Sequence, residues 1–257
     1  MTTPQKTVAF FGASTGVGLS ALRYSLAGGC RCIALCRDPS KLTTVLSPET
    51  TPNLEVVQGN AHDAAAVARC LRTADGGLVD AVVFTIGARF VASKMTLEDP
   101  HVCERGIEAV LKAMTEIRQQ LGPGAKQSKT PHVIVCSTTG ISRLGRDTPL
   151  AFVPLYSLGL KVPHADKLAM EDKLVKAATG SNGETEYTYT MVRPSLLVDG
   201  ETERAVRVGV EDPAAGTRES RAIGYTISRE DTGKWVAQNL VLNTNPAYLG
   251  KAVTITY

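Results

Sequence analysis

The sequence predicts an α/β protein with a doubly wound parallel sheet of about seven strands and helices on both faces. An apolar run over residues 6–11 is typical of a buried strand. A glycine-rich stretch, Gly12-x-x-x-Gly16-x-Gly18, follows it directly, and residues 19–27 are compatible with a helix. Strand-like and helix-like segments then alternate along most of the chain, which is the pattern of a parallel sheet.

The glycine-rich stretch is a candidate dinucleotide site. Glycine lets the backbone turn sharply and lets a phosphate approach it, and the following helix points its N-terminal amides at a pyrophosphate. An ordinary strand–helix turn is the alternative, but the preceding strand and the following helix are the context that the motif requires. The cofactor-binding residues expected here are Gly12, Ser14, Thr15, Gly16, Val17 and Gly18.

The end of the second expected strand, residues 31–36, indicates which dinucleotide binds. A cofactor without a 2′-phosphate usually meets an acidic side chain there. Here Arg37 follows the strand and Lys41 lies four residues further on, and a guanidinium matches a phosphate in charge and shape. Asp38 is an alternative acceptor for a ribose hydroxyl, although it also resembles a helix cap. We therefore expect NADP(H) as the cofactor.

Further elements continue the alternation. Expected strands cover residues 54–58, 80–84, 132–136, 187–192 and 252–257. Expected helices cover residues 63–73, 102–121 and 162–174, and another begins near residue 227. Residues 200–222 are polar and charged, and we interpret them as a mobile second lid.

Composition and charge exclude several classes of protein. The net charge is +3, with 28 basic and 25 acidic residues mixed along the chain, so nothing predicts a surface for nucleic acid or for a membrane. No run approaches the ~18 apolar residues of a membrane span, and the N-terminus lacks a signal-peptide core. We expect a cytoplasmic protein.

The cysteines do not predict a metal site. Cys30, Cys32 and Cys36 lie in and beside an apolar strand, on positions that share one face. Metal sites prefer turns with closer pairs, so we expect buried, reduced thiols and no metal.

The three glycines resemble the fingerprint of short-chain dehydrogenases/reductases, which are single-domain Rossmann enzymes that use NAD(H) or NADP(H). The resemblance extends over nearly the whole chain and implies one cofactor-binding domain over residues 1–257. It implies further cofactor contacts after the third, fourth and sixth strands, at Asn60, Ala61, Gly87, Pro194, Ser195, Leu196 and Leu197.

The resemblance breaks down at the catalytic residues. The family usually has a Ser after the fifth strand, and Ser137 or Thr138 fills that place. It then has Tyr and Lys on the next helix, where Tyr exchanges the proton and Lys binds the ribose. Lys167 matches the lysine, but Pro163 stands where the tyrosine belongs.

Without that tyrosine, the chain either lacks ketone chemistry or reduces a substrate that needs no acid. An iminium ion is such a substrate, because it is already cationic and accepts hydride directly. It needs an anion nearby, and preorganised charge is often the largest catalytic contribution. Asp166, beside Lys167, is our candidate for that anion; a helix-end carboxylate is the alternative.

The stretch from Val162 to Lys167 also resembles the fungal reductases of malbrancheamide- and paraherquamide-type prenylated indole alkaloid pathways. That resemblance implies NADPH-dependent reduction of a cationic azadiene, followed by an intramolecular [4+2] cycloaddition to a bicyclo[2.2.2]diazaoctane. It implies that Asp166 pairs with the cation and that the partner is a hydrophobic prenylated indole.

Two other functions stay open. The chain could be a catalytically inactive NADP(H)-binding sensor, or a conventional carbonyl reductase that uses Tyr156 after a local rearrangement. The loop over residues 144–155, with Phe152 among its apolar residues, is expected to cover the substrate, and an ordinary packing loop is the alternative. The sequence also leaves a homo-oligomer open.

Overall fold

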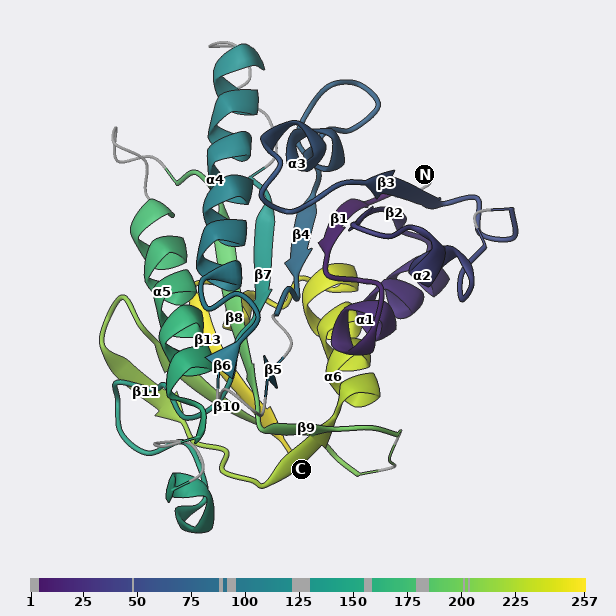
Figure 1. Cartoon of the computed structure of the whole chain (residues 1–257). Coiled ribbons are helices and arrows are strands. Elements are labelled where there is room, and N and C mark those ends of the chain that lie inside the picture. Colours follow the sequence, from purple (N-terminus) through teal and green to yellow (C-terminus); the bar gives the residue numbers. More distant parts are fainter. Residues whose placement is uncertain are drawn as a thin grey trace.

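A nine-stranded sheet is the centre of the structure (Figure 1). The computed structural model describes residues 5–47, 49–87, 90–91, 96–121, 130–154, 159–178, 185–200, 202 and 204–257. The strand order is β11-β10-β13-β8-β7-β4-β1-β2-β3. The strands are β1 (Thr7–Phe11), β2 (Arg31–Cys36), β3 (Leu54–Gln58), β4 (Ala81–Phe84), β7 (His132–Cys136), β8 (Thr188–Pro194), β10 (Arg207–Asp212), β11 (Thr217–Ser220) and β13 (Lys251–Thr256).

Seven of these strands, from β13 to β3, are parallel. Their order is that of a doubly wound sheet: β2 and β3 lie on one side of β1, and β4 and the later strands lie on its other side. The predicted fold class is therefore confirmed. Because ligands bind beyond the carboxyl ends of such strands, the residues after β1, β2, β4, β7 and β8 define the functional edge.

The expectation of a mobile lid over residues 200–222 was wrong. Within that range, β10 and β11 form an antiparallel hairpin, and β10 pairs with β13 at the edge of the sheet. Val208 and Val210 alternate with other residues along β10, which is the period of a strand. The surrounding charges obscured this short pattern, and several of those charges form ion pairs in the structure.

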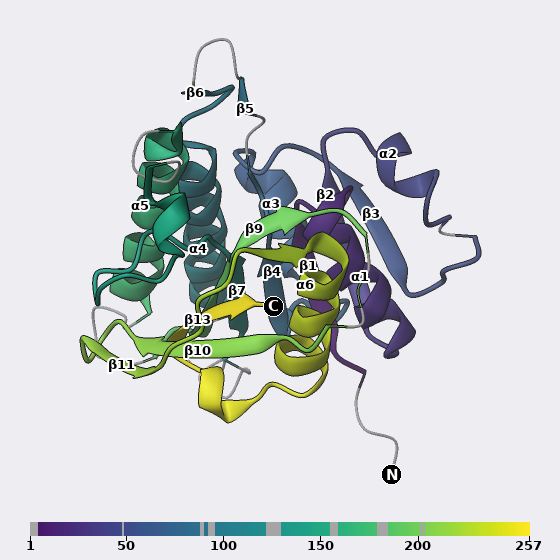
Figure 2. The same ribbon diagram turned by 90° about the horizontal axis from the view of Figure 1, so that it is seen from below.

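Helices cover both faces of the sheet (Figures 1 and 2). One layer contains α1 (Gly16–Ala27), α6 (Arg229–Val236) and the π-helical segment Ala237–Leu242 that continues α6. The opposite layer contains α3 (Ala64–Leu71), α4 (Val102–Leu121) and α5 (Lys161–Ala177). Each layer has its own apolar core against the sheet.

Shorter elements lie around the edges of the sheet and its two helical layers. The helix α2 (Ser40–Thr43) follows β2, and a short 3-10 turn, Leu150–Phe152, precedes α5. A second 3-10 turn, Pro246–Tyr248, precedes β13, and there are two small ribbons: β5 (Phe90–Val91) with β6 (Thr96–Leu97), and β9 (Leu196–Val198) with β12 (Thr226–Ser228).

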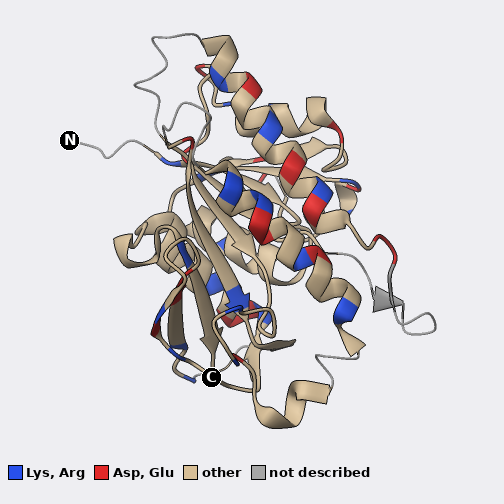
Figure 3. Ribbon diagram, turned by 90° about the vertical axis from the view of Figure 1, so that its left-hand side faces the viewer, with Lys and Arg blue, Asp and Glu red and all other residues tan. Residues whose placement is uncertain are grey.

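The outer surfaces of the long helices carry both signs of charge (Figure 3). Lys173 of α5 lies 3.0 Å from Glu108 and 3.5 Å from Glu104, both on α4, so the two helices are bridged by ion pairs. In the described part of the chain, no helix has the length and apolar character that a membrane crossing requires.

A buried histidine makes the stability of the fold depend on pH. His132 begins β7, is 4% exposed and contacts the Thr190 hydroxyl of β8 at 2.9 Å. Burial is the main reason that its pKa falls from 6.5 to about 4. Between these two values the unfolded chain binds more protons, so the free energy of unfolding decreases as the pH falls.

We predict that this histidine removes about 3 kcal/mol of stability between pH 6.5 and pH 4. Urea unfolding of the wild type and of His132→Asn across this range measures the effect, since the variant lacks the titrating group. Parallel pH profiles of the two proteins would contradict the prediction.

Candidate functional site

The glycine-rich loop lies at the carboxyl end of β1 and leads directly into α1. Helix α1 begins at Gly16, and the side chain of the preceding Thr15 makes no capping hydrogen bond. The first turn of α1 contains no acidic residue. Its N-terminal amides are therefore left for an external anion, as a dinucleotide pyrophosphate requires.

Close packing explains why glycine is needed at position 18. A Cβ atom on Gly18 would lie 2.4 Å from the carbonyl oxygen of Gly12 and 2.3 Å from the hydroxyl of Thr85. The Thr85 hydroxyl follows β4 and donates to the Gly12 carbonyl at 3.1 Å. Sequence analysis missed Thr85, which ties the end of β4 to the loop; its position in place of the family's usual Asn was the available signal.

The end of β2 presents two cations. Arg37 and Lys41 are exposed, and their side chains make no hydrogen bond or ion pair with any described residue. Asp38 accepts hydrogen bonds from the amide and the hydroxyl of Ser40, at 3.2 and 2.6 Å, and these bonds lower the pKa of its carboxyl group. The Asp38 carboxylate is thus engaged by Ser40, the first residue of α2, and Arg37 is available for a 2′-phosphate.

The other predicted cofactor contacts surround the same edge. Asn60 is exposed after β3, and its side-chain oxygen accepts from the amide of His62 at 3.2 Å, while Ala61 is buried. Gly87 is exposed after β4, and no atom would contact an added Cβ there. The cradle of backbone, open space and cations therefore fits a dinucleotide phosphate.

Lys167 lies where the ends of two strands meet. Its ammonium group donates to the carbonyl oxygen of Cys136 at 2.6 Å and to that of Ile86 at 3.1 Å. These residues are at the ends of β7 and β4. Burial lowers the pKa of Lys167, but Cys103, Cys136 and Asp166 act in the opposite direction, and the net shift is upward. The side chain is therefore a fixed positive charge at the functional edge.

The predicted hydroxyl residues after β7 differ in what they contact. Ser137 is 5% exposed, and its hydroxyl has no partner among the described residues. Thr138 is half-buried and donates to the carbonyl oxygen of Thr139 at 3.1 Å. Because a buried hydroxyl normally finds a partner, Ser137 is the better candidate for a contact with a bound molecule.

Asp166 has a different environment from the one expected for a residue facing a cation. It is 2% exposed, and its two carboxylate oxygens accept from the amides of Cys103 and Glu104, at 3.0 and 2.9 Å. These amides belong to the first turn of α4. The carboxylate thus caps a helix N-terminus, where the dipole stabilises negative charge. No arginine among the described residues shares this position, and Arg143 pairs instead with Asp172.

The turn after β8 is only partly directed at the expected cofactor. Ser195 is 3% exposed, and its hydroxyl donates to the Thr256 hydroxyl at 2.9 Å, so its side chain points into the sheet. Pro194 is buried within β8. Leu196 and Leu197 form β9, and Leu196 is 38% exposed. The leucines therefore remain the candidates for contact with the nicotinamide.

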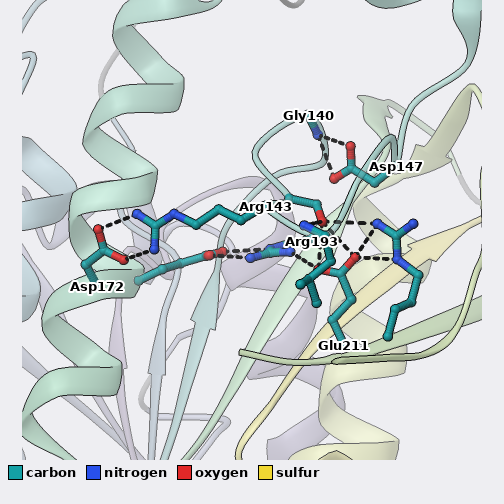
Figure 4. Close-up of polar contacts among 10 residues, drawn as sticks. Gly140, Arg143, Asp147, Asp172, Arg193 and Glu211 are labelled. Carbon is teal, nitrogen blue, oxygen red and sulfur yellow. Dashed lines mark hydrogen bonds and ion pairs between the residues drawn. The ribbon is translucent and has the colours of Figure 1, made fainter. Parts of the chain in front are cut away.

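A buried ion network holds the loop after β7 (Figure 4). Arg193 of β8 binds Glu171 of α5 at 2.6 Å and Glu211 of β10 at 2.7 Å. Glu211 also pairs with Arg218 of β11, which donates to the Gly145 carbonyl at 2.8 Å. The β10–β11 hairpin thus fixes the loop against α5.

Between this loop and α5 lies an open cavity of about 460 Å³. Arg146, Asp147 and Lys161 contribute its charged lining. Both oxygens of Asp147 accept from the Gly140 amide, at 3.0 and 2.9 Å, and burial is the main cause that raises the pKa of its carboxyl group. Two cations and one acid give this cavity a positive balance.

The predicted Tyr156 lies outside the described residues. In the described part of the chain, no tyrosine hydroxyl is hydrogen-bonded to Lys167, and no group of three His, Cys, Asp or Glu residues could hold a metal. The six cysteines are buried and unpaired as disulfides, as expected.

The sheet order and the cradle at α1 define a dinucleotide-binding protein. Comparison with known proteins gives the family: a model described as NAD(P)H-binding matches residues 12–241. This chain belongs to the NAD(P)H-binding family. It is 39% identical to Reductase pytE of Aspergillus terreus, with 100% of both chains covered. It is 31% identical to Oxidase pynE of Aspergillus niger, covering 97% of this chain and 98% of that one.

Solved structures agree on the fold. A short-chain dehydrogenase/reductase from Veillonella parvula in complex with NADP has a TM-score of 0.69 at 12% identity, covering 98% and 94% of the two chains. ChuY, an anaerobillin reductase from Escherichia coli O157:H7, has a TM-score of 0.61 at 17% identity, covering 97% and 96%. The family match gives NAD(P)H as the cofactor of this chain, and the reduced nicotinamide of that cofactor supplies a hydride.

We predict that Asp166→Asn lowers the free energy of unfolding by about 1–3 kcal/mol, because an amide group would face the α4 amides. Asp172→Asn, on the same helix but 51% exposed, is the matched control and should change stability by less than about 1 kcal/mol. Urea unfolding compares them. Equal stability of the two variants would contradict a capping role.

We also predict that Arg37→Ala weakens NADPH binding about tenfold and leaves NADH binding nearly unchanged. Arg31→Ala removes an exposed arginine from the other end of the same strand and serves as the control. Titration of both dinucleotides gives the ratio. If Arg37→Ala weakened neither or both equally, the guanidinium would not read the 2′-phosphate.

Proposed function

We propose that this protein is a short-chain-type reductase that uses NADPH to reduce an electrophile needing no proton from the enzyme. The leading substrate is a cationic iminium or azadiene intermediate. A hydride added to the carbon of a C=N⁺ bond gives a neutral amine directly, so electrons and charge balance without an acid.

The single observation that carries the proposal is the position of Pro163. It lies in the first turn of α5, one turn before Lys167, where a proton-donating tyrosine would be needed. A proline ring in a first turn fits the helix without breaking it but carries no acidic group. The ammonium of Lys167 is occupied by two carbonyl oxygens, and its raised pKa makes it a poor acid.

The residues of this chain would then orient and shield the substrate. We propose that the Ser137 hydroxyl forms a hydrogen bond with a bound molecule, as donor or as acceptor, and that Thr138 lines the same part of the site. The ammonium group of Lys167 either binds a ribose hydroxyl of the cofactor or keeps the carbonyl oxygens of Ile86 and Cys136 in position. Asp166 contributes by capping α4, and we do not propose that it touches the substrate cation.

The resemblance to fungal alkaloid reductases extends the proposal to a second step. We propose that the product of reduction, a hydrophobic prenylated indole, undergoes an intramolecular [4+2] cycloaddition before release. Holding diene and dienophile together is an entropic effect worth up to about 7–11 kcal/mol in favourable cases. Phe152 and Tyr225, whose rings meet edge to face at 5.1 Å, give an aromatic surface beside the loop.

The charge of the cavity favours a second candidate. Arg146 and Lys161 outweigh Asp147 among its charged lining. Such a site suits an enolate better than a cation, because positive charge stabilises the anion that forms when a hydride adds to a conjugated C=C bond and that water then protonates. We therefore name α,β-unsaturated carbonyl compounds as the alternative substrate class.

The experiment compares three electrophiles on one carbon skeleton: an iminium ion, a conjugated enone and a saturated ketone. Each is incubated with the protein and NADPH, and products are identified by mass spectrometry and chiral chromatography. We expect reduction of the iminium and little of the ketone. The Tyr156→Phe variant, which lacks only the tyrosine hydroxyl, should reduce the iminium at the wild-type rate.

The other outcomes separate the alternatives. Preferred turnover of the enone supports the second candidate, and ketone reduction that Tyr156→Phe abolishes supports a conventional carbonyl reductase. Because one relative is named an oxidase, the amine product is also tested with NADP⁺. If none of these mixtures changes while NADPH binds, the chain is a cofactor sensor and the proposal fails.

A further inference from the structure

An arginine from α6 stands at the mouth of the dinucleotide cradle. Arg229 is the first residue of α6, and α6 packs tightly on α1. An added Cβ on Gly233 of α6 would lie 2.4 Å from the Cβ of Ser20 in α1, so the two helix backbones are in close contact. The two helices lie side by side in Figures 1 and 2. Their contact fixes the start of α6 near the start of α1.

The side chain of Arg229 passes directly over Gly16. Its Cδ atom is 3.3 Å, and its Nε atom 4.0 Å, from the point where a Cβ of Gly16 would lie. Gly16 is the first residue of α1, whose first-turn amides have no side-chain cap. A guanidinium and a helix N-terminus therefore face the same space, and both attract an anion.

We propose that Arg229 binds the diphosphate of the bound dinucleotide, and that it leaves Asp199 to do so. In the structure, one guanidinium nitrogen lies 2.7 Å from a carboxylate oxygen of Asp199. Asp199 is 91% exposed and Arg229 is 39% exposed. An ion pair this exposed is weak, whereas a diphosphate offers two charges and several acceptor oxygens.

The exchange would couple two parts of the cofactor site. Asp199 directly follows β9, whose leucines are the candidates for contact with the nicotinamide. Arg229 follows β12, which pairs with β9. The Asp199–Arg229 ion pair thus connects the end of β9, beside the expected nicotinamide, to the diphosphate end of the site. Binding of the cofactor releases Asp199 from this ion pair. This inference depends on the NADP(H) site and is independent of the substrate proposed above.

Dinucleotide affinity without any substrate is the direct test. The chain has one tryptophan, Trp235, which lies in α6, so energy transfer from Trp235 to NADPH or NADH reports binding. The variants are Arg229→Ala, Arg229→Lys and Asp199→Asn. The matched control is Arg23→Ala, because Arg23 of α1 also faces α6 and lies 3.7 Å from Glu230, about 10 Å along α1 from Gly16.

We expect Arg229→Ala to weaken NADPH and NADH about tenfold each, since both contain the diphosphate. Arg229→Lys should lose less, because it keeps the charge. Asp199→Asn should tighten both by up to about fivefold by removing the competitor. Arg23→Ala should bind like the wild type, and thermal unfolding confirms that each variant is folded.

Three results would overturn the inference. Arg229→Ala could bind both dinucleotides like the wild type, which removes the contact. It could weaken NADPH alone, which would place the guanidinium at the 2′-phosphate. Asp199→Asn could weaken binding, which would make the ion pair a support rather than a competitor. If the wild type itself bound neither dinucleotide, the cofactor assignment would fail together with the role of Arg229.

Discussion

The ammonium group of Lys167, held between the carbonyl oxygens of Ile86 and Cys136, fixes the geometry on which the site depends. It joins the ends of β4 and β7 to α5. The adjacent Asp166 caps α4, and Glu171, one turn later, pairs with Arg193 of β8. Three contacts made within about one and a half turns of α5 therefore position both strand ends and the neighbouring helix. In each contact a charged side chain meets backbone hydrogen-bonding groups or an opposite charge, and such pairing offsets the cost of burying the charge.

Further contacts tie the loops around the open cradle to the sheet. The glycine-rich loop is tied to β4 through Thr85, and the loop after β7 is tied to the edge hairpin through Arg218. The α1 amides, the Ser137 hydroxyl and the Arg37 side chain are left without protein partners among the described residues. Polar groups left open at the functional edge of a rigid frame are those that a ligand completes.

The sequence predicted most of the fold because its local signals agreed with one another. The glycine-rich turn, the start of the helix expected from residue 63, which the structure caps with Asp63, and the apolar strands all appear where their patterns placed them. The β10–β11 hairpin escaped prediction because its pairing with β13 is distant in sequence and its charges are neutralised only in three dimensions. The cofactor contacts and the roles of Ser137, Thr138 and Lys167 remain predictions.

Asp166 shows the limit of reading a site from a motif. Its neighbour Lys167 suggested that both side chains face one pocket, yet adjacent residues on a helix point about 100° apart. Lys167 points to the strand ends, and Asp166 points to α4. Only the packing of α5 against α4 decides this, and no local pattern encodes it. The missing tyrosine, by contrast, was visible directly because a proline cannot imitate a phenol.

We propose that hydride reaches the substrate without a proton donated by the protein. Isotope effects on a single turnover test it most directly. We expect NADPH deuterated at the transferred position to slow the step, and we expect the same step to be unchanged in D₂O. If D₂O slowed hydride transfer as well, and the two effects multiplied, a proton would move in the same step, and hydride transfer without a proton donor would be disproved.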